Sequence, residues 1–355
     1  MFLHGVVFLS DTWQNWWLPV VRAAIAEEVS DIHVTAGQAV WFRHDGVLHP
    51  FAAGTVPTEA RLWDVLVKML TDDQRKALRR ERSVDFSWVA DHRRFRGNAY
   101  FQQDVPALAL RLLPARIPTL KEIGAPESLA DLTTAEHGLI LVTGKVGAGK
   151  TTTLAAFLDA VNHSRTAHIV TLEDPIEYIY TPDQCFISQR ELGRDFLSFA
   201  EALRNALREA PDIVLVGEIR DAETMRTAMM AAETGTLVLG TLHTARASEA
   251  ALRIAGMFPV AEQETIRAQL AEVLLAVFAQ RLIPAKNGGR VATMEVLLAT
   301  PAVRSLIRQG KYAQLDSTML ARGGMQTGDM DLDRLYEQGE ITRETREKYR
   351  SQPLW

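Results

Sequence analysis

The chain has 355 residues, 47% apolar and 23% charged, a composition typical of a soluble globular protein with two domains or one large one. Its net charge of -5 gives no general attraction to nucleic acid or acidic lipid. The single cysteine, Cys185, excludes an internal disulfide and a four-cysteine zinc site and indicates a reducing compartment. We interpret Cys185 as a small, partly buried apolar residue.

No segment approaches the ~20 consecutive apolar residues of a membrane span. The apolar run Gly5–Leu9 is short, follows no Lys or Arg, and soon meets Asp11, so it is a poor signal peptide. We therefore expect a cytoplasmic protein whose membrane association, where there is any, goes through a partner.

The first third of the chain predicts a mixed α and β domain. Pro19–Val29 is expected to be a helix, with proline in its first turn. Val40–Phe51 is expected to be a hairpin around the Asp45-Gly46 turn, and Pro57–Leu78 is expected to be helical, with apolar residues at helical spacing. From Val84 to Leu113 the pattern alternates, which predicts strands.

Three prolines and a glycine in Pro114–Pro126 indicate a domain boundary near residue 115, which gives domains 1–115 and 116–355. Beyond it, short apolar runs alternate with helical stretches, which predicts a largely parallel sheet covered by helices. The expected strands are Leu139–Thr143, Ile169–Leu172, Ile213–Val216 and Leu237–Leu242, and the expected helices are Lys150–Asn162, Leu197–Glu209 and Ala222–Thr234.

An apolar stripe at helical spacing follows later in the chain. It consists of Leu270, Val273, Leu274, Val277 and Phe278. The spacing predicts a helix that packs this stripe into the core.

The segment Gly144–Thr151 (GKVGAGKT) has the GxxxxGK[ST] pattern of a phosphate-binding P-loop, between a predicted strand and a predicted helix. Its glycines allow successive backbone N–H groups to point at phosphate oxygens, and the helix start adds its positive dipole end. Lys150 is expected to reach the β and γ phosphates, and the Thr151 hydroxyl to hold Mg2+. The expected nucleotide-binding residues are Gly144, Lys145, Val146, Gly147, Ala148, Gly149, Lys150, Thr151 and Thr152.

Four predicted strands each end in polar chemistry. They are followed by the P-loop, by a run containing Glu173, by a run containing Glu218, and by His243. Ligands bind beyond the carboxyl ends of the strands of an open parallel sheet. If these strands are parallel neighbours, all four groups meet at one edge.

Asp212 opens the third of these strands and Glu218 follows it, six residues later. Six extended residues span roughly 20 Å, so only one of the two carboxylates lies near the phosphates. The strand direction selects Glu218, which we assign to Mg2+ or its water, with activation of the attacking water as a further role. Asp212 is expected to be structural, as a strand-start or capping residue.

Glu173 is a candidate second acidic group that polarises water or binds the metal through water. The alternative for Glu173 is a simple ion pair with a basic neighbour, and the same alternative applies to Glu177. His243 is a candidate sensor of the γ-phosphate by hydrogen bonding; a buried histidine with satisfied partners is the alternative. Which carboxylate, Glu173 or Glu218, activates water stays open.

These blocks, at these intervals, resemble the secretion ATPase superfamily of type II secretion and type IV pilus motors. The matching blocks are the P-loop, an Asp box (Thr171–Tyr178), Arg194–Pro211, a Walker B segment (Asp212–Asp221) and a His box (Gly240–Thr244). In the first domain, Ser30–Gly37, Arg43–Gly46 and Arg94–Ala99 are similar to the PAS-like N-terminal domain of that superfamily. The resemblance covers about residues 18–345 and implies an α/β fold with a RecA-like P-loop ATPase domain, C-terminal helices and a smaller PAS-like α+β domain.

Within the superfamily the chain most resembles the PilT-like pilus-retraction branch. It lacks the four-cysteine insertion of assembly and secretion ATPases, and Ala302–Gln309 (AVRSLIRQ) is similar to a segment associated with retraction motors. The resemblance implies a cytoplasmic ATPase that powers pilin disassembly and twitching motility. A pilus-assembly or type II secretion ATPase, or an accessory retraction ATPase, is the alternative within the superfamily.

The resemblance also implies ATP and Mg2+ as ligands and a homohexameric ring. Its implied partner is an inner-membrane pilus platform protein, at which the chain sits peripherally, with pilin acted on indirectly and no direct contact with nucleic acid. By motif position, Arg96 and Arg111 are the first-domain arginines that approach the phosphates. Surface salt bridges are the alternative for both.

Two readings from other classes remain. A RecA-like nucleic-acid translocase uses the same core, but the acidic net charge and the Asp box disfavour it. A regulatory nucleotide-binding subunit without turnover is disfavoured by the intact acidic residues.

Overall fold

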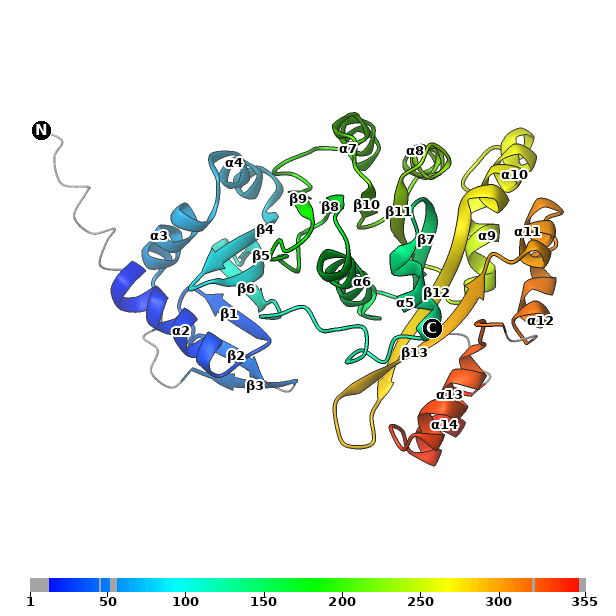
Figure 1. The fold of residues 1–355 in the computed structure, drawn as a ribbon. Helices are drawn as coiled ribbons and strands as arrows, with labels where there is room; N and C mark the ends of the chain where they lie inside the picture. Colours follow the sequence, from blue (N-terminus) through cyan, green and yellow to red (C-terminus); the bar gives the residue numbers. More distant parts are fainter. Residues whose placement is uncertain (1–12, 45, 52–55, 321–322, 351–355) are drawn as a thin grey trace, which may run out of the picture. The chain divides into compact units, whose positions relative to one another are not determined.

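The computed structural model describes residues 13–44, 46–51, 56–320 and 323–350 (Figure 1). The chain divides into two compact units, Met1–Arg116 and Ile117–Trp355, each built on its own sheet. The run Gly5–Leu9 and Asp45 of the predicted turn lie outside the described residues. Within the described ranges, no helix has the length and hydropathy needed to cross a membrane.

The first unit has a six-stranded sheet in the order β3-β2-β1-β6-β5-β4, in which every neighbouring pair is antiparallel. Its strands are β1 (Asp31–Thr35), β2 (Trp41–His44), β3 (Val47–Pro50), β4 (Ser83–Ala90), β5 (Arg93–Gln102) and β6 (Val105–Leu112). Its helices are a π-helical segment (Trp13–Trp17), α2 (Leu18–Ala26), α3 (Glu59–Met69) and α4 (Asp72–Glu81). The predicted hairpin and the predicted strands between Val84 and Leu113 are confirmed.

The core of the first unit collects the apolar residues of its helices on one side of the sheet. Trp16 and Trp17 are buried in it, next to Val20 and Val21 of α2. Trp13 packs edge-on against Trp88, with ring centroids 5.7 Å apart. Part of the tryptophan-rich start of the chain therefore serves the packing of this unit.

The helical prediction over Pro57–Leu78 is confirmed for most of the segment, but the structure divides it into two helices, α3 and α4. Leu70 between them is extended, and the Thr71 side chain accepts a hydrogen bond from the backbone N–H of Gln74, whose own side chain accepts one from Thr71 N–H. This reciprocal capping box starts a new helix and interrupts the apolar period. Strand β1, which the sequence reading did not single out, lies in the middle of the sheet.

The second unit has a seven-stranded sheet in the order β13-β12-β7-β11-β10-β8-β9, antiparallel only at the β13 edge (Figure 1). Its strands are β7 (Gly138–Thr143), β8 (His168–Glu173), β9 (Phe186–Glu191), β10 (Ile213–Val216), β11 (Leu237–Leu242), β12 (Leu274–Pro284) and β13 (Arg290–Leu298). Its α-helices are α5 (Glu127–Asp131), α6 (Lys150–Ser164), α7 (Phe199–Ala206), α8 (Ala222–Glu233), α9 (Ala247–Ala255), α10 (Gln263–Val273), α11 (Pro301–Arg308), α12 (Leu315–Met319), α13 (Gly328–Glu337) and α14 (Arg343–Tyr349). Short 3-10 turns occupy Leu132–Thr134, Leu207–Glu209, Val260–Glu262 and Tyr312–Gln314.

The four strands predicted for this unit are confirmed, as are the three helices between them. Every residue of β7, β10 and β11 is buried, which is the burial that a parallel sheet covered on both faces requires. The apolar runs in the sequence are therefore continuous rather than alternating at these strands.

The helix predicted from the apolar stripe over residues 270–278 is wrong beyond Val273. Helix α10 ends there, and β12 begins at Leu274 and pairs with β7 on one side and β13 on the other. Val277 and Phe278 are buried, as expected, but on opposite faces of a strand. An apolar run that is buried on both faces satisfies the helical and the extended period equally, so spacing alone does not distinguish them.

Candidate nucleotide site

The strand order places four carboxyl ends side by side, because β7, β11, β10 and β8 are adjacent and parallel. The register pairs Thr143 of β7 with Leu242 of β11, the last residue of each strand. The segments that follow them, the P-loop and His243, therefore leave the sheet at the same edge. The four strands are parallel neighbours, which was the condition for their following segments to meet at one edge.

The P-loop backbone follows positions that only glycine adopts readily. Gly144, Gly147 and Gly149 have φ of 141°, 79° and 87°, in the region that L-residues with a side chain avoid. A Cβ on Gly144 would also lie 2.3 Å from the backbone oxygen of Gln280 in β12. The loop thus bends tightly against the neighbouring strand and delivers Lys150 to the first position of α6.

The Lys150 side chain is hydrogen-bonded to the backbone of the P-loop. Its Nζ donates hydrogen bonds to the carbonyl oxygens of Gly144 at 2.7 Å and Lys145 at 3.0 Å. Burial lowers the pKa of the Lys150 ammonium, and the nearby carboxylates of Glu218 and Glu177 act in the opposite direction. The ammonium therefore belongs to the same electrostatic cluster as the Walker B acid, where phosphate oxygens would be strong acceptors.

Glu218 lies just past β10, and both of its carboxylate oxygens are engaged. Oε1 is 2.8 Å from Nε2 of His243, and Oε2 accepts a hydrogen bond from Arg220 at 2.7 Å. The hydrogen bond from Arg220 is the largest cause of a lowered Glu218 pKa. The structure therefore brings together Glu218 and His243, which were predicted separately, and adds Arg220, which the sequence reading did not single out.

Glu173 is the last residue of β8 and is 5% exposed. Its Oε1 accepts a hydrogen bond from the Thr171 hydroxyl at 2.7 Å and one from Gln189 Nε2 at 3.4 Å. A Cβ on Gly217 would lie 3.3 Å from the Glu173 Cα, so the loop that carries Glu218 passes directly beside Glu173. The two acidic groups are neighbours at this edge, and Glu173 is oriented by Thr171 and Gln189.

The first turn of α6 is tied to the Asp box. Thr151 is half-buried beside Lys150, and the hydroxyl of Thr152 is 3.0 Å from the hydroxyl of Tyr178. Burial raises the Tyr178 pKa, so this hydroxyl stays protonated and neutral at physiological pH. In the P-loop itself, Lys145, Val146 and Gly147 are exposed and Ala148 is buried.

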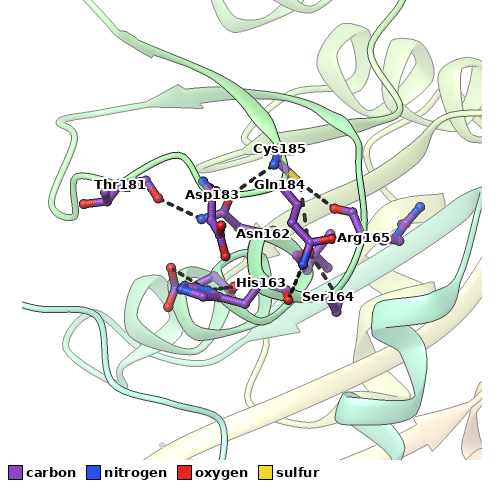
Figure 2. Close-up of polar contacts among 10 residues, drawn as sticks. Asn162, His163, Ser164, Arg165, Thr181, Asp183, Gln184 and Cys185 are labelled. Atoms are coloured by element: carbon purple, nitrogen blue, oxygen red, sulfur yellow. Dashed lines mark hydrogen bonds and ion pairs between the residues drawn. The ribbon is translucent and has the colours of Figure 1, made fainter.

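The far end of α6 fastens the segment that follows the Asp box (Figure 2). Asn162 is fully buried, and its side chain accepts hydrogen bonds from the backbone N–H groups of Asp183 and Cys185 and donates one to the carbonyl of Thr181. Cys185 is a buried free cysteine whose thiol contacts the carbonyl of Arg165 at 3.1 Å. Residues 178–185 are thus attached to α6 at both of its ends.

Asp212 lies at the opposite end of β10 from Glu218. Its Oδ2 accepts a hydrogen bond from the backbone N–H of His168, the first residue of β8, at 2.7 Å. This contact is a strand-start cap, the structural role expected for Asp212.

The two arginines predicted from the first domain lie side by side on its sheet. Arg96 of β5 and Arg111 of β6 are direct register partners, and both are exposed. Arg111 donates a hydrogen bond to Asp31 at 2.9 Å, so the alternative role, a surface salt bridge, is present for this arginine.

A magnesium ion at this edge would rely on few protein ligands. The described residues contain no group of three or more His, Cys, Asp and Glu side chains placed to hold a metal. Mg2+ that accompanies a nucleotide keeps several waters and takes only one or two protein oxygens besides the phosphates. The Thr151 hydroxyl and the Glu218 carboxylate fit that requirement.

A parallel sheet, a strand–P-loop–helix unit and two acidic residues at the same edge define a P-loop ATPase. The family model for Type II/IV secretion system protein matches residues 14–287. The chain belongs to this family and is one of its ATPases.

Similar proteins match over most of the chain. It is 44% identical to "Type IV pilus retractation ATPase PilT" of Pseudomonas aeruginosa over 90% of this chain and 94% of that protein. It is 44% identical to "Uncharacterized protein YggR" of Escherichia coli over 90% of this chain and 96% of that protein. A crystal structure of the pilus retraction motor PilT with bound ADP superposes with a TM-score of 0.89 at 41% identity, over 95% of this chain and 98% of that one.

Proposed function

We propose that this chain is a hexameric, Mg2+-dependent ATPase that powers retraction of a type IV pilus. The observation that carries the proposal is 44% identity to a pilus-retraction ATPase along 90% of the chain, together with the P-loop and acidic edge described above. It would act from the cytoplasm on an inner-membrane platform protein and through it on pilin, without binding nucleic acid. The crystallised relative that binds ADP supports a nucleotide in the P-loop.

Different residues would bind the phosphates and the metal ion. The P-loop backbone from Gly144 to Thr152 would cradle the phosphates, with Lys150 exchanging its two carbonyl acceptors for phosphate oxygens. Thr151 and Glu218 would hold Mg2+, which neutralises charge on the transferring phosphoryl group when bound. Support for these roles comes from the position of these side chains around the start of α6 and the end of β10.

The two acidic residues, Glu173 and Glu218, would act on the attacking water. Glu173 is buried and oriented by Thr171, a setting in which a carboxylate can position a water molecule or take its proton. His243 is hydrogen-bonded to Glu218 and would sense the γ-phosphate by hydrogen bonding. We propose that the motor consists of a PAS-like domain, residues 1–115, and a RecA-like domain, residues 116–355, with Arg96 and Arg111 of the first acting on the phosphates within the ring.

Pilus dynamics in a deletion strain test the direction of force. Removing the gene should abolish retraction and leave surplus surface pili, and the wild-type gene should restore retraction when it is returned. The gene carrying Lys150→Ala should fail to restore it, because the ammonium that binds phosphate is gone. Loss of surface pili on deletion would instead identify an assembly ATPase, and normal retraction with the Lys150→Ala gene would contradict the motor role.

A further inference from the structure

Gln280 of β12 lies behind the P-loop and was not among the expected site residues. Gln280 is 2% exposed, and both ends of its side-chain amide are engaged. Oε1 accepts a hydrogen bond from the Thr153 hydroxyl in the first turn of α6 at 2.6 Å, and Nε2 donates one to the carbonyl of Ala148 at 2.8 Å. One side chain thus joins the loop to the helix that the loop begins.

Two glycines of the P-loop pack against the same residue. A Cβ on Gly144 would lie 2.3 Å from the Gln280 backbone oxygen, and a Cβ on Gly149 would lie 2.8 Å from Gln280 Nε2. These glycines therefore serve two needs, their positive φ and the close approach of β12. The P-loop therefore packs against Gln280 near both ends of the loop.

The bond to Ala148 determines where a phosphate donor points. The peptide between Ala148 and Gly149 is planar and trans, so its N–H points away from its C=O. Because the Ala148 carbonyl is bonded to Gln280, the Gly149 N–H is aimed away from Gln280 and can serve as one of the backbone donors that a P-loop offers to phosphate. Losing the amide would free this peptide to rotate.

We propose that Gln280 is a positioning residue for nucleotide binding, which holds the P-loop peptides in their phosphate-binding orientation from the neighbouring strand. The role requires an amide, because one end must accept from Thr153 and the other must donate to Ala148. A glutamate would face the Ala148 carbonyl with a second acceptor, and an apolar side chain would satisfy neither partner. The inference rests on the proposed nucleotide site.

The test compares Gln280→Leu with a matched control, both in the full-length chain. Loss of the two hydrogen bonds should raise the Kd for Mg-ADP and the KM for ATP by about tenfold, while kcat changes less. Asp331→Asn is the control, because Asp331 is equally buried and bonds to the backbone of β13 and to Arg334, away from the loop. That variant should lose thermal stability without a change in Kd or KM.

A second pair of variants covers the case in which Gln280→Leu does not fold. Thr153→Val removes the partner hydroxyl and should raise the Kd for ADP, whereas Thr153→Ser keeps the hydroxyl and should retain most of the affinity. Wild-type Kd and KM in Gln280→Leu, with stability lowered as in the control, would overturn the inference and leave Gln280 as core packing. Equal affinities in Thr153→Val and Thr153→Ser would do the same. If the wild-type chain itself binds no ADP, the proposed function fails instead.

Discussion

Two charged regions of this molecule are built in opposite ways. At the P-loop edge, formed by Lys150, Glu173, Glu218 and His243, each carboxylate or ammonium is held by named neighbours and partly or fully withdrawn from water. The arginine pair, Arg96 and Arg111, stands exposed on an antiparallel sheet. Buried groups held in place cost little reorganisation when charge develops, whereas exposed side chains lose more conformational freedom when a ligand orders them, even where one of them, Arg111, is already bonded to Asp31. We therefore expect the P-loop edge to determine chemistry and the arginine pair to modulate it.

The largest effect should come from Glu218→Gln at the P-loop edge. The amide keeps the shape of the carboxylate but removes the negative charge that would bind Mg2+ or take a proton from water. ATP turnover should fall about 10²- to 10⁴-fold, the range for loss of a positioned acid or base, while ATP binding stays largely intact. Steady-state ATPase assays and equilibrium binding of ATP measure the two quantities.

Glu201→Gln provides the matched control for that experiment, since Glu201 is an exposed glutamate in the first turn of α7. It should hydrolyse ATP at the wild-type rate. Full turnover in Glu218→Gln would remove Glu218 from the mechanism and leave Glu173 as the remaining candidate acid.

A smaller effect is expected for Arg96→Ala in the arginine pair. If Arg96 hydrogen-bonds the phosphates, turnover should fall roughly 10- to 100-fold, the size of one charge-assisted hydrogen bond, with unfolding temperature unchanged because the side chain is exposed. Arg22→Ala, which removes an exposed salt bridge to Asp91 in the same unit, should leave turnover unaltered. Identical turnover in both variants would return Arg96 to an ordinary surface role.

The same contrast explains what the sequence could predict. The P-loop, Glu173, Glu218 and His243 each come at or just after the end of a predominantly apolar run, so local pattern and strand direction place them at one edge once the strands are parallel neighbours. Gln280 lies more than a hundred residues from the P-loop, inside an apolar run, and its contact follows from sheet order alone. Of the two residues that sequence reasoning missed, Arg220 had the stronger signal, because it stands two residues after Glu218 in the Walker B segment.

The fold shows the same limit. Strands β7, β10 and β11 were predictable because turn signals bound them and helices alternate with them. The change from α10 to β12 at Leu274 was not, because no breaker separates the two and both bury apolar residues. The arginine pair had no local signal of its own and was found only through resemblance to a family.

The smallest effect should appear in the acid dependence of stability. The Glu218 pKa is lowered from 4.5, chiefly by the hydrogen bond from Arg220, so the stabilisation from its charge is fully present above about pH 4.5 and is lost as pH falls through the folded-state pKa. Since Arg220 is mostly exposed, solvent screening limits the pair to about 1 kcal/mol or less, or roughly 2 °C in Tm for a domain of this size. The Tm difference between wild type and Glu218→Gln should therefore be present at pH 8 and should narrow in acid, as the pH falls through the folded-state pKa of Glu218. In an Arg220→Met background, the Tm difference between Glu218 and Glu218→Gln should be smaller at pH 8, because the cation that favours the charged carboxylate is gone. A Tm difference that persists unchanged into acid would show that the P-loop edge holds Glu218 by packing rather than by charge. Electrostatic stabilisation would then no longer distinguish the P-loop edge from the arginine pair.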